Sequence, residues 1–238
     1  GELVAERAQD AGVTLVGSSG DLASRCGTVF SAVVTSVAAA VAEDAAAHLN
    51  ENHVYVDLNS TSPALKQQIG RTIEASGARF VEAAVMAAVP PLGHRVPMLL
   101  CGAAAGDLMA RLAPYGMELD DLGSEIGGAS ATKMFRSIVV KGLEALFLEC
   151  IWAAAPYGVA ERVLDTVGVG YPGLDWNKLA HYLLGRTAVH GKRRAHEMEE
   201  VAETLKAMEI EPIMAAAAAR RLSWAAGFDL EARFGAKP

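Results

Sequence analysis

The chain has 238 residues, of which 52% are hydrophobic and 21% are charged, and its formal net charge is −7. This length and apolar content allow a buried core and exclude an intrinsically disordered chain, while the acidic balance argues against nucleic acids and membranes as partners. The three cysteines, Cys26, Cys101 and Cys150, lack the spacing of a metal site or a disulfide framework, so we expect no metal and a cytoplasmic location.

Short apolar runs alternate with helical segments in the first half of the chain. We predict strands at residues 13–16, 28–34, 53–58, 79–85, 96–101 and 117–122. We predict helices at residues 2–11, 21–25, 37–49, 63–75 and 105–113. This alternation with short turns predicts an α/β fold with an open, largely parallel sheet.

The pattern changes at Gly127 and Gly128, after which we expect helices only. They are predicted at residues 129–155, 159–166, 176–185, 187–208 and 212–226. The first is apolar on more than one face, which is typical of a buried central helix. We therefore expect an α/β domain at residues 1–126 and an all-helical domain at residues 127–238.

Ligands of open α/β sheets bind beyond the carboxyl ends of the strands. Three predicted strands end in candidate segments, at residues 33–36, 57–63 and 85–95. Residues 57–63, with Asn59, Ser60 and Thr61, place hydroxyl and amide groups before a helix N-terminus, which suits an anion or a sugar hydroxyl. The same residues could serve only as a helix cap and a side-chain turn.

Near the start of the long helix, Lys133, Arg136 and Ser137 share one face because they are three and four residues apart. Two cations there oppose the helix dipole, so a bound anion or a partner carboxylate should offset them. Burial lowers the pKa of a lysine and suits it to proton transfer, although the side chain could also extend to solvent.

A later helix carries His190, Arg193, Arg194 and Glu197 on one face. Such a stripe could recognise a carboxylate or phosphate, or it could be an ordinary solvated face. The chain has no GxSxG, HExxH or P-loop motif.

The order of three segments resembles the β-hydroxyacid dehydrogenases, which include 3-hydroxyisobutyrate dehydrogenase and 6-phosphogluconate dehydrogenase-like enzymes. The segments are residues 57–63 (DLNSTSP), residues 80–85 (FVEAAV) and Lys133 at the opening of a long helix. Residues 89–97 and 133–137 also look familiar from a helical bacterial subgroup of this family.

The resemblance implies a Rossmann domain that binds NAD or NADP, followed by a helical domain that forms a homodimer. It further implies hydride transfer between the cofactor and a small, anionic hydroxy acid or a related alcohol or carbonyl compound, with Lys133 as general acid and base. Asn59, Ser60 and Thr61 would lie near the nicotinamide ribose and the substrate. Val33, Val34 and Thr35 would lie against the cofactor.

The chain departs from the family pattern at several positions. Met86 and two alanines occupy the family's substrate-carboxylate loop, Ser137 replaces an asparagine, and the usual Lys-Asp pair falls near His196 and Glu197. We therefore expect substrate recognition by the residues Met86, Arg136, Ser137, His190, Arg193 and Arg194.

The family's first strand and its GxGxxG turn are not found before the opening helix, so we expect that about 30 or more residues of one βαβ unit are missing from this chain. Two alternative functions stay open. One is an imine or ketone reductase on the same fold, and the other is a catalytically silent dimeric binding protein.

Overall fold

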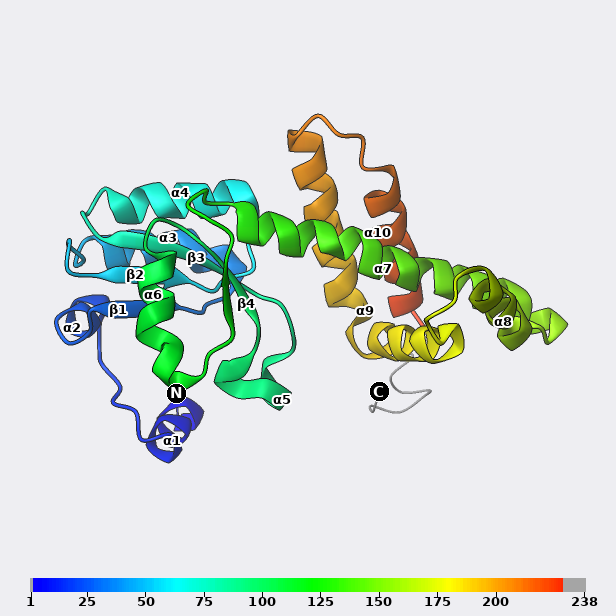
Figure 1. Ribbon diagram of the computed structural model, residues 1–238, viewed down its shortest axis with the longest axis horizontal. Coiled ribbons are helices and arrows are strands. Elements are labelled where there is room, and N and C mark those ends of the chain that lie inside the picture. Colours follow the sequence, from blue (N-terminus) through cyan, green and yellow to red (C-terminus); the bar gives the residue numbers. More distant parts are fainter. Residues whose placement is uncertain (1, 229–238) are drawn as a thin grey trace. The chain divides into compact units, whose positions relative to one another are not determined.

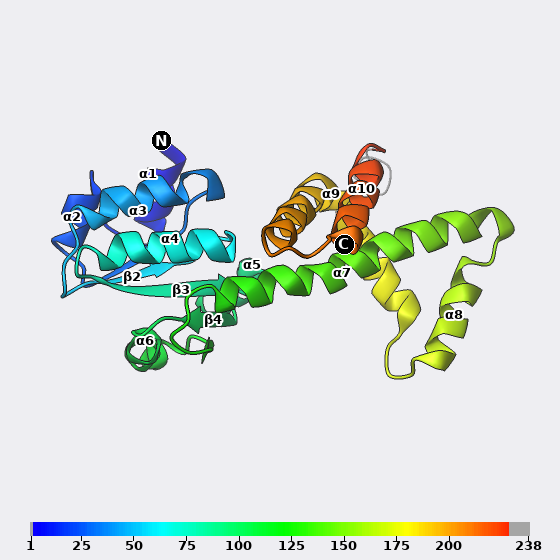
Figure 2. The same cartoon turned by 90° about the horizontal axis from the view of Figure 1, so that it is seen from above.

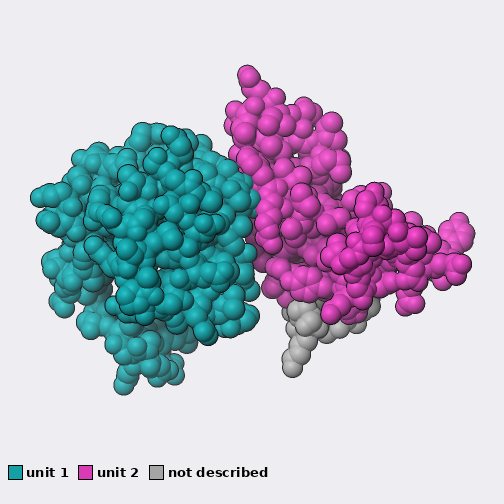
Figure 3. Space-filling model, viewed as in Figure 1, with its two compact units in different colours: residues 1–133 teal, residues 134–238 magenta. Residues whose placement is uncertain are grey.

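The computed structural model describes residues 2–228 and divides the chain into two compact units, with the division between Lys133 and Met134 (Figure 3). The strands among these residues all lie in unit 1, and unit 2 is helical. The predicted fold class, an α/β region followed by a helical region, is confirmed.

Five strands form one sheet in unit 1, in the spatial order β1-β2-β3-β4-β5 (Figure 1). Their bounds are β1 Thr28–Ser31, β2 Val54–Asp57, β3 Arg79–Val85, β4 Met98–Cys101 and β5 Leu119–Asp121. β1, β2 and β3 are parallel, β4 is antiparallel to β3, and β5 is parallel to β4. The direction reverses at β4 because the connection from β3 carries only the short helices α5 (Val89–Leu92) and η2 (Gly93–Arg95), whereas a parallel pair needs a longer crossover.

Residues 13–16, predicted as a strand, lie outside the sheet. The N–H of Val13 binds the carbonyl of Ala8 and closes helix α1 (Glu2–Asp10), where Gly12 has the positive φ of +66° that suits a helix end. The prediction is wrong because an apolar run forms a strand only beside a partner strand, and none of the described strands pairs with this segment.

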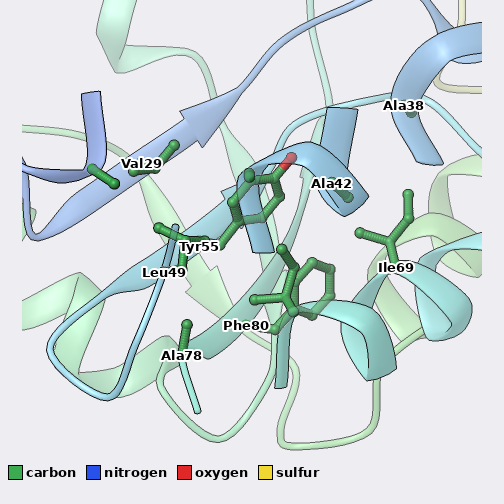
Figure 4. Packing of buried hydrophobic residues seen from close by; sticks show 11 residues of the cluster. Val29, Ala38, Ala42, Leu49, Tyr55, Ile69, Ala78 and Phe80 are labelled. Atoms are coloured by element: carbon green, nitrogen blue, oxygen red, sulfur yellow. The ribbon is translucent and has the colours of Figure 1, made fainter. Parts of the chain in front are cut away.

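Helices cover both faces of the sheet (Figures 1 and 2). The helix pair α3 (Ala38–Ala46) and α4 (Pro63–Glu74) lies on one face of the sheet, and α6 (Ala105–Leu112) lies on the other. Two short helices, α2 (Ser19–Ala23) and η1 (Thr35–Val37), precede α3. Between the sheet and the helices α3 and α4, the rings of Tyr55 and Phe80 stack with centroids 6.3 Å apart, beside Ala42 and Ile69 (Figure 4). Ala38, Ala42 and Ala45 of α3 are buried in the same cluster, and their small side chains suit close packing of a helix on the sheet.

Unit 2 is built from long helices. Their bounds are α7 Gly128–Ala154, which begins in unit 1, α8 Ala160–Gly170, α9 Trp176–Ala207 and α10 Ile213–Ala226. The helices predicted at 176–185 and 187–208 form one element that is interrupted at His190, where φ is −124°. The interruption lies beside a close approach of α9 to α10, because a Cβ on Gly191 would lie 3.1 Å from Cβ of Ala226. No helix within residues 2–228 combines the length and apolar character needed to span a bilayer.

Gly102, directly after β4, is expected to be intolerant of a side chain. Its φ is +129°, and an added Cβ would lie 2.6 Å from the carbonyl oxygen of Phe80 in the neighbouring strand. We expect Gly102→Ala to lower the free energy of unfolding by about 2–3 kcal/mol, measured by urea denaturation. Gly106→Ala is the control, because its added Cβ would meet only Asp121 Oδ2 at 4.0 Å. Equal losses in the two variants would contradict the expected strain at Gly102.

Candidate functional site

The segment that follows β2 is held by the side chain of Asn59. Its Oδ1 accepts a hydrogen bond from the N–H of Val33 at 2.7 Å, and its Nδ2 donates to Ser31 Oγ at 3.0 Å. The backbone N–H of Asn59 donates to Asp57 Oδ1 at 2.8 Å. Asn59 therefore ties the carboxyl ends of β1 and β2 together, and it brings two of the three predicted segments side by side.

A buried lysine of α4, Lys66, supports the same segment. Its Nζ donates to the carbonyl oxygen of Asp57 at 2.8 Å and lies 3.2 Å from Asp57 Oδ1. Burial lowers the pKa of Lys66, and the charges of Asp57 and Glu82 act in the opposite direction. Lys66 was not among the predicted site residues, although its spacing to Ile69 and Ile73 marks the buried face of α4.

Glu82 of β3 holds the start of α7, and it too was not selected as a site residue. Its Oε2 accepts a hydrogen bond from the N–H of Gly127 and its Oε1 from the N–H of Ser130, each at 2.6 Å, and the residue is fully buried. A carboxylate there satisfies free N–H groups and complements the positive end of the helix dipole. Cys101 lies at the same point, and burial, reinforced by the charge of Glu82, raises the pKa of its thiol.

Lys133 lies five residues beyond Gly128, the first residue of α7, and its side chain contacts the loop after β2. Its Nζ donates a hydrogen bond to Ser60 Oγ at 2.7 Å. Ser60 directly follows Asn59, so the lysine amine lies beyond the carboxyl ends of the parallel strands, where open α/β sheets bind their ligands. An amine in hydrogen-bond contact with a hydroxyl at such a place can exchange a proton with a bound alcohol or carbonyl oxygen.

Val33, Val34 and Thr35 form the loop after β1 and lie beside this arrangement. Thr35 Oγ1 donates to the carbonyl oxygen of Ser60 at 3.1 Å, and Val34 is 68% exposed. The side chain of Thr61 is buried, and its Oγ1 has no hydrogen-bond partner among the described residues. The loop after β1 therefore presents exposed apolar side chains beside the carboxyl ends of β1 and β2.

Met86, at the end of β3, was expected to contact substrate. Its side chain is partly buried and packs with Ala84, Cys101 and Ala129, next to the start of α7. Beyond it, Val89 and Leu92 of α5 are exposed, at 48% and 41%. The loop after β3 therefore presents apolar side chains to the surface.

Arg194, expected to bind substrate, has a partner inside the core of unit 2 instead. Its Nε donates to Glu144 Oε2 at 2.7 Å and a second nitrogen donates to Oε1, with both residues almost fully buried. Thr187 Oγ1 contributes a third contact to Glu144 at 3.4 Å. Burial raises the pKa of Glu144, and the hydrogen bonds and charge of Arg194 oppose that rise. A substrate anion could reach Arg194 only by displacing this carboxylate.

The neighbouring cations of unit 2 also have carboxylate partners. Glu197 binds both Arg193 and Lys141, the latter at 2.6 Å, and Lys141 Nζ donates to Ser137 Oγ at 3.3 Å. Burial alone would raise the pKa of Glu197, but the hydrogen bond and charge of Lys141 outweigh it and the pKa is lowered. His190, at the interruption of α9, and Arg136 of α7 are exposed. The predicted stripe on α9 is therefore largely neutralised by acids of the same unit.

Removing the Asn59 amide tests its role in joining the two loops. We expect Asn59→Ala to lower the free energy of unfolding by about 1–3 kcal/mol, because it leaves buried hydrogen-bonding groups unpaired, and to speed hydrogen exchange at the N–H of Val33. The control is Asn177→Ala, which removes an exposed hydrogen bond to Asp165 in unit 2. Exchange at Val33 that stayed as slow as in the parent protein would show that Asn59 does not hold the loop.

Two family models match the chain. Residues 2–107 match the NAD binding domain of 6-phosphogluconate dehydrogenase, and residues 154–225 match a domain of unknown function (DUF1932).

Solved structures of similar proteins extend over nearly the whole chain. A conserved hypothetical protein from Sinorhizobium meliloti is 40% identical, with a TM-score of 0.84 over 95% of this chain and 75% of that one. The conserved protein MTH1747, described as of unknown function and structurally similar to 3-hydroxyacid dehydrogenases, is 34% identical, with a TM-score of 0.82 over 94% of this chain and 84% of that one. The 3-hydroxyisobutyrate dehydrogenase of Mycobacterium tuberculosis, at 15% identity, has a TM-score of 0.74 over 92% of this chain and 80% of that one, and shares the fold.

Proposed function

Because the chain belongs to the β-hydroxyacid dehydrogenase family, we propose that it is an NAD(P)-dependent oxidoreductase acting on a small hydroxy acid or a related alcohol or carbonyl compound. The observation that carries the proposal is the hydrogen bond from Lys133 Nζ to Ser60 Oγ at the carboxyl ends of β1 and β2. This contact supports the proposal because it puts a proton donor beyond the carboxyl ends of parallel strands, where open α/β sheets bind their ligands.

Lys133 and Ser60 have different roles at the substrate oxygen: Lys133 transfers the proton and Ser60 orients the oxygen. During oxidation, neutral Lys133 Nζ takes the hydroxyl proton while a hydride leaves the adjacent carbon; during reduction, the ammonium returns a proton to the carbonyl oxygen. Ser60 Oγ, already within hydrogen-bond distance of Nζ, orients the same oxygen. The bound nicotinamide would accept or supply the hydride. The residues that would hold the nicotinamide are Val33, Val34, Thr35 and Asn59.

Cofactor binding and turnover test this function directly. We expect NADH or NADPH fluorescence to change saturably on addition of the protein, and NAD(P)H to be consumed with at least one member of a panel of small keto acids and aldehydes. Consumption with imines but not with ketones would assign the alternative reductase. A protein that neither binds NAD(P)H nor consumes it would be a binding protein without catalysis.

Arg136 is our candidate for recognition of an anionic substrate, because it lies on α7 one turn beyond Lys133 and is exposed. We expect Arg136→Gln to raise KM about tenfold for an anionic substrate, which equals the loss of one charge-assisted contact, and to leave KM for its neutral ester unchanged. Lys192→Gln, which removes an exposed cation of α9, is the matched control. An equal rise in KM for the acid and its ester would contradict recognition of charge by Arg136.

A further inference from the structure

We propose that Glu82 is the positioning residue of this site: its buried carboxylate fixes the first turn of α7 and thereby places the amine of Lys133 against Ser60. The inference deepens the proposed function and rests on it, since it concerns the residue to which proton transfer is assigned.

Both oxygens of Glu82 are engaged at the start of the helix. One accepts from Gly127, the residue before α7, and the other from Ser130, the third residue of α7. Two contacts of 2.6 Å to N–H groups three residues apart hold the helix start in one orientation, whereas a single capping contact would let it rotate. Lys133 follows Ser130 by three residues, so the orientation of this turn sets where its side chain begins.

The turn into α7 is also held from the side of α4. Gly127 has φ +111°, and an added Cβ would lie 3.2 Å from Gln67 Nε2 and 3.4 Å from Cβ of Pro63. Gln67 Nε2 in turn donates to the carbonyl oxygen of Ile126 at 3.0 Å. A glycine at this position lets the backbone pass between α4 and β3 and point its N–H groups at Glu82.

One buried cation links the two sides of the Lys133–Ser60 contact. The charge of Glu82 acts on Lys66, which also forms the ion pair with Asp57. Asp57 holds the N–H of Asn59, next to Ser60, while Glu82 holds the helix that carries Lys133. Within this buried group, Asp57 thus positions Ser60 and Glu82 positions Lys133, while Lys66 interacts with both carboxylates.

Chemical labelling of Lys133 tests the proposal without substrate or cofactor. In Glu82→Gln either the N–H of Gly127 or that of Ser130 would face an amide NH₂ in place of an oxygen, so the helix start should shift and Lys133 should lose its fixed contact with Ser60. Using an amine-reactive reagent over a range of pH and peptide mass spectrometry on the full chain, we expect the labelling of Lys133 relative to Lys192 to change by about threefold or more, equal to half a unit in an ionisation equilibrium. Glu82→Asp keeps the buried charge and should give a smaller change.

The matched control removes a carboxylate cap from the other long helix. Asp175 accepts from the N–H of Lys178 at 2.8 Å at the start of α9, so Asp175→Asn should lower stability and leave the labelling of Lys133 unchanged. If Glu82→Gln lowers stability in the same way without changing Lys133, Glu82 is only a helix cap and the proposal is overturned; if that variant does not fold, Glu82→Asp decides by the same readout. Altered labelling in a protein that shows no hydride transfer would support the positioning role and refute the proposed function.

Discussion

Lys133→Met is expected to lower kcat about 10²- to 10⁴-fold, the usual contribution of a general acid and base, while NAD(P)H binds as in the parent protein. Methionine keeps an unbranched side chain but cannot donate a hydrogen bond to Ser60 or exchange a proton. The cofactor would be held by the loop after β1 and by Asn59, none of which the substitution touches. The loss should therefore appear in kcat for the carbonyl substrate, with the fluorescence titration of NAD(P)H unchanged.

Two further variants separate the proton-transfer role from a general effect of charge. Lys133→Arg keeps the positive charge but cannot release its proton, so it should be impaired nearly as strongly. Lys178→Met, which removes an exposed lysine of α9, should have parental kinetics. An active Lys133→Met enzyme would remove this residue from the chemistry and would leave the Ser60 contact as a structural one.

The local patterns of the sequence were sufficient for most of the secondary structure. β3 is Arg79–Val85, as predicted from its apolar run, and α7 differs from its predicted bounds by one residue at each end. Residues 13–16 were misassigned because a strand depends on a neighbour that a local pattern does not contain. The antiparallel direction of β4 was not predicted for a similar reason, because the pairing of two strands depends on the connection between them.

The candidate site was predictable only where a motif carried it. Asn59, Ser60 and Lys133 were selected from segments that resemble a family, and the structure brings them together in unit 1. Lys66 and Glu82 were not, because the partner of each buried charge is identified only after the chain has folded. Burial of a charge is a property of the tertiary structure. These two buried charges bind the backbone of the segments that carry Ser60 and Lys133.

The buried ion pair of Arg194 and Glu144 gives the largest expected effect on stability. These residues lie 50 positions apart, on α9 and α7, and their side chains are 4% and 0% exposed. Removing one partner leaves the other charge unpaired in the core, so Arg194→Met or Glu144→Leu should each lower the free energy of unfolding by about 3–5 kcal/mol. Urea denaturation measures the loss, and Arg193→Met is the control, because Arg193 forms its ion pair on the surface and should cost no more than about 1 kcal/mol.

The double variant Glu144→Leu/Arg194→Met should recover most of the loss, because no unpaired charge remains in the core. Additive losses would instead show that the two residues act independently.

The pH dependence of Arg194→Met supplies a second check. Burial already raises the pKa of Glu144 in the folded protein, and loss of Arg194 removes the groups that oppose this rise. A folded-state pKa above the unfolded value means that stability is retained at low pH and lost as pH rises through the folded-state pKa. The penalty of Arg194→Met should therefore be smaller in acid, where Glu144 takes up a proton, than at neutral pH, where it must carry its charge without a partner.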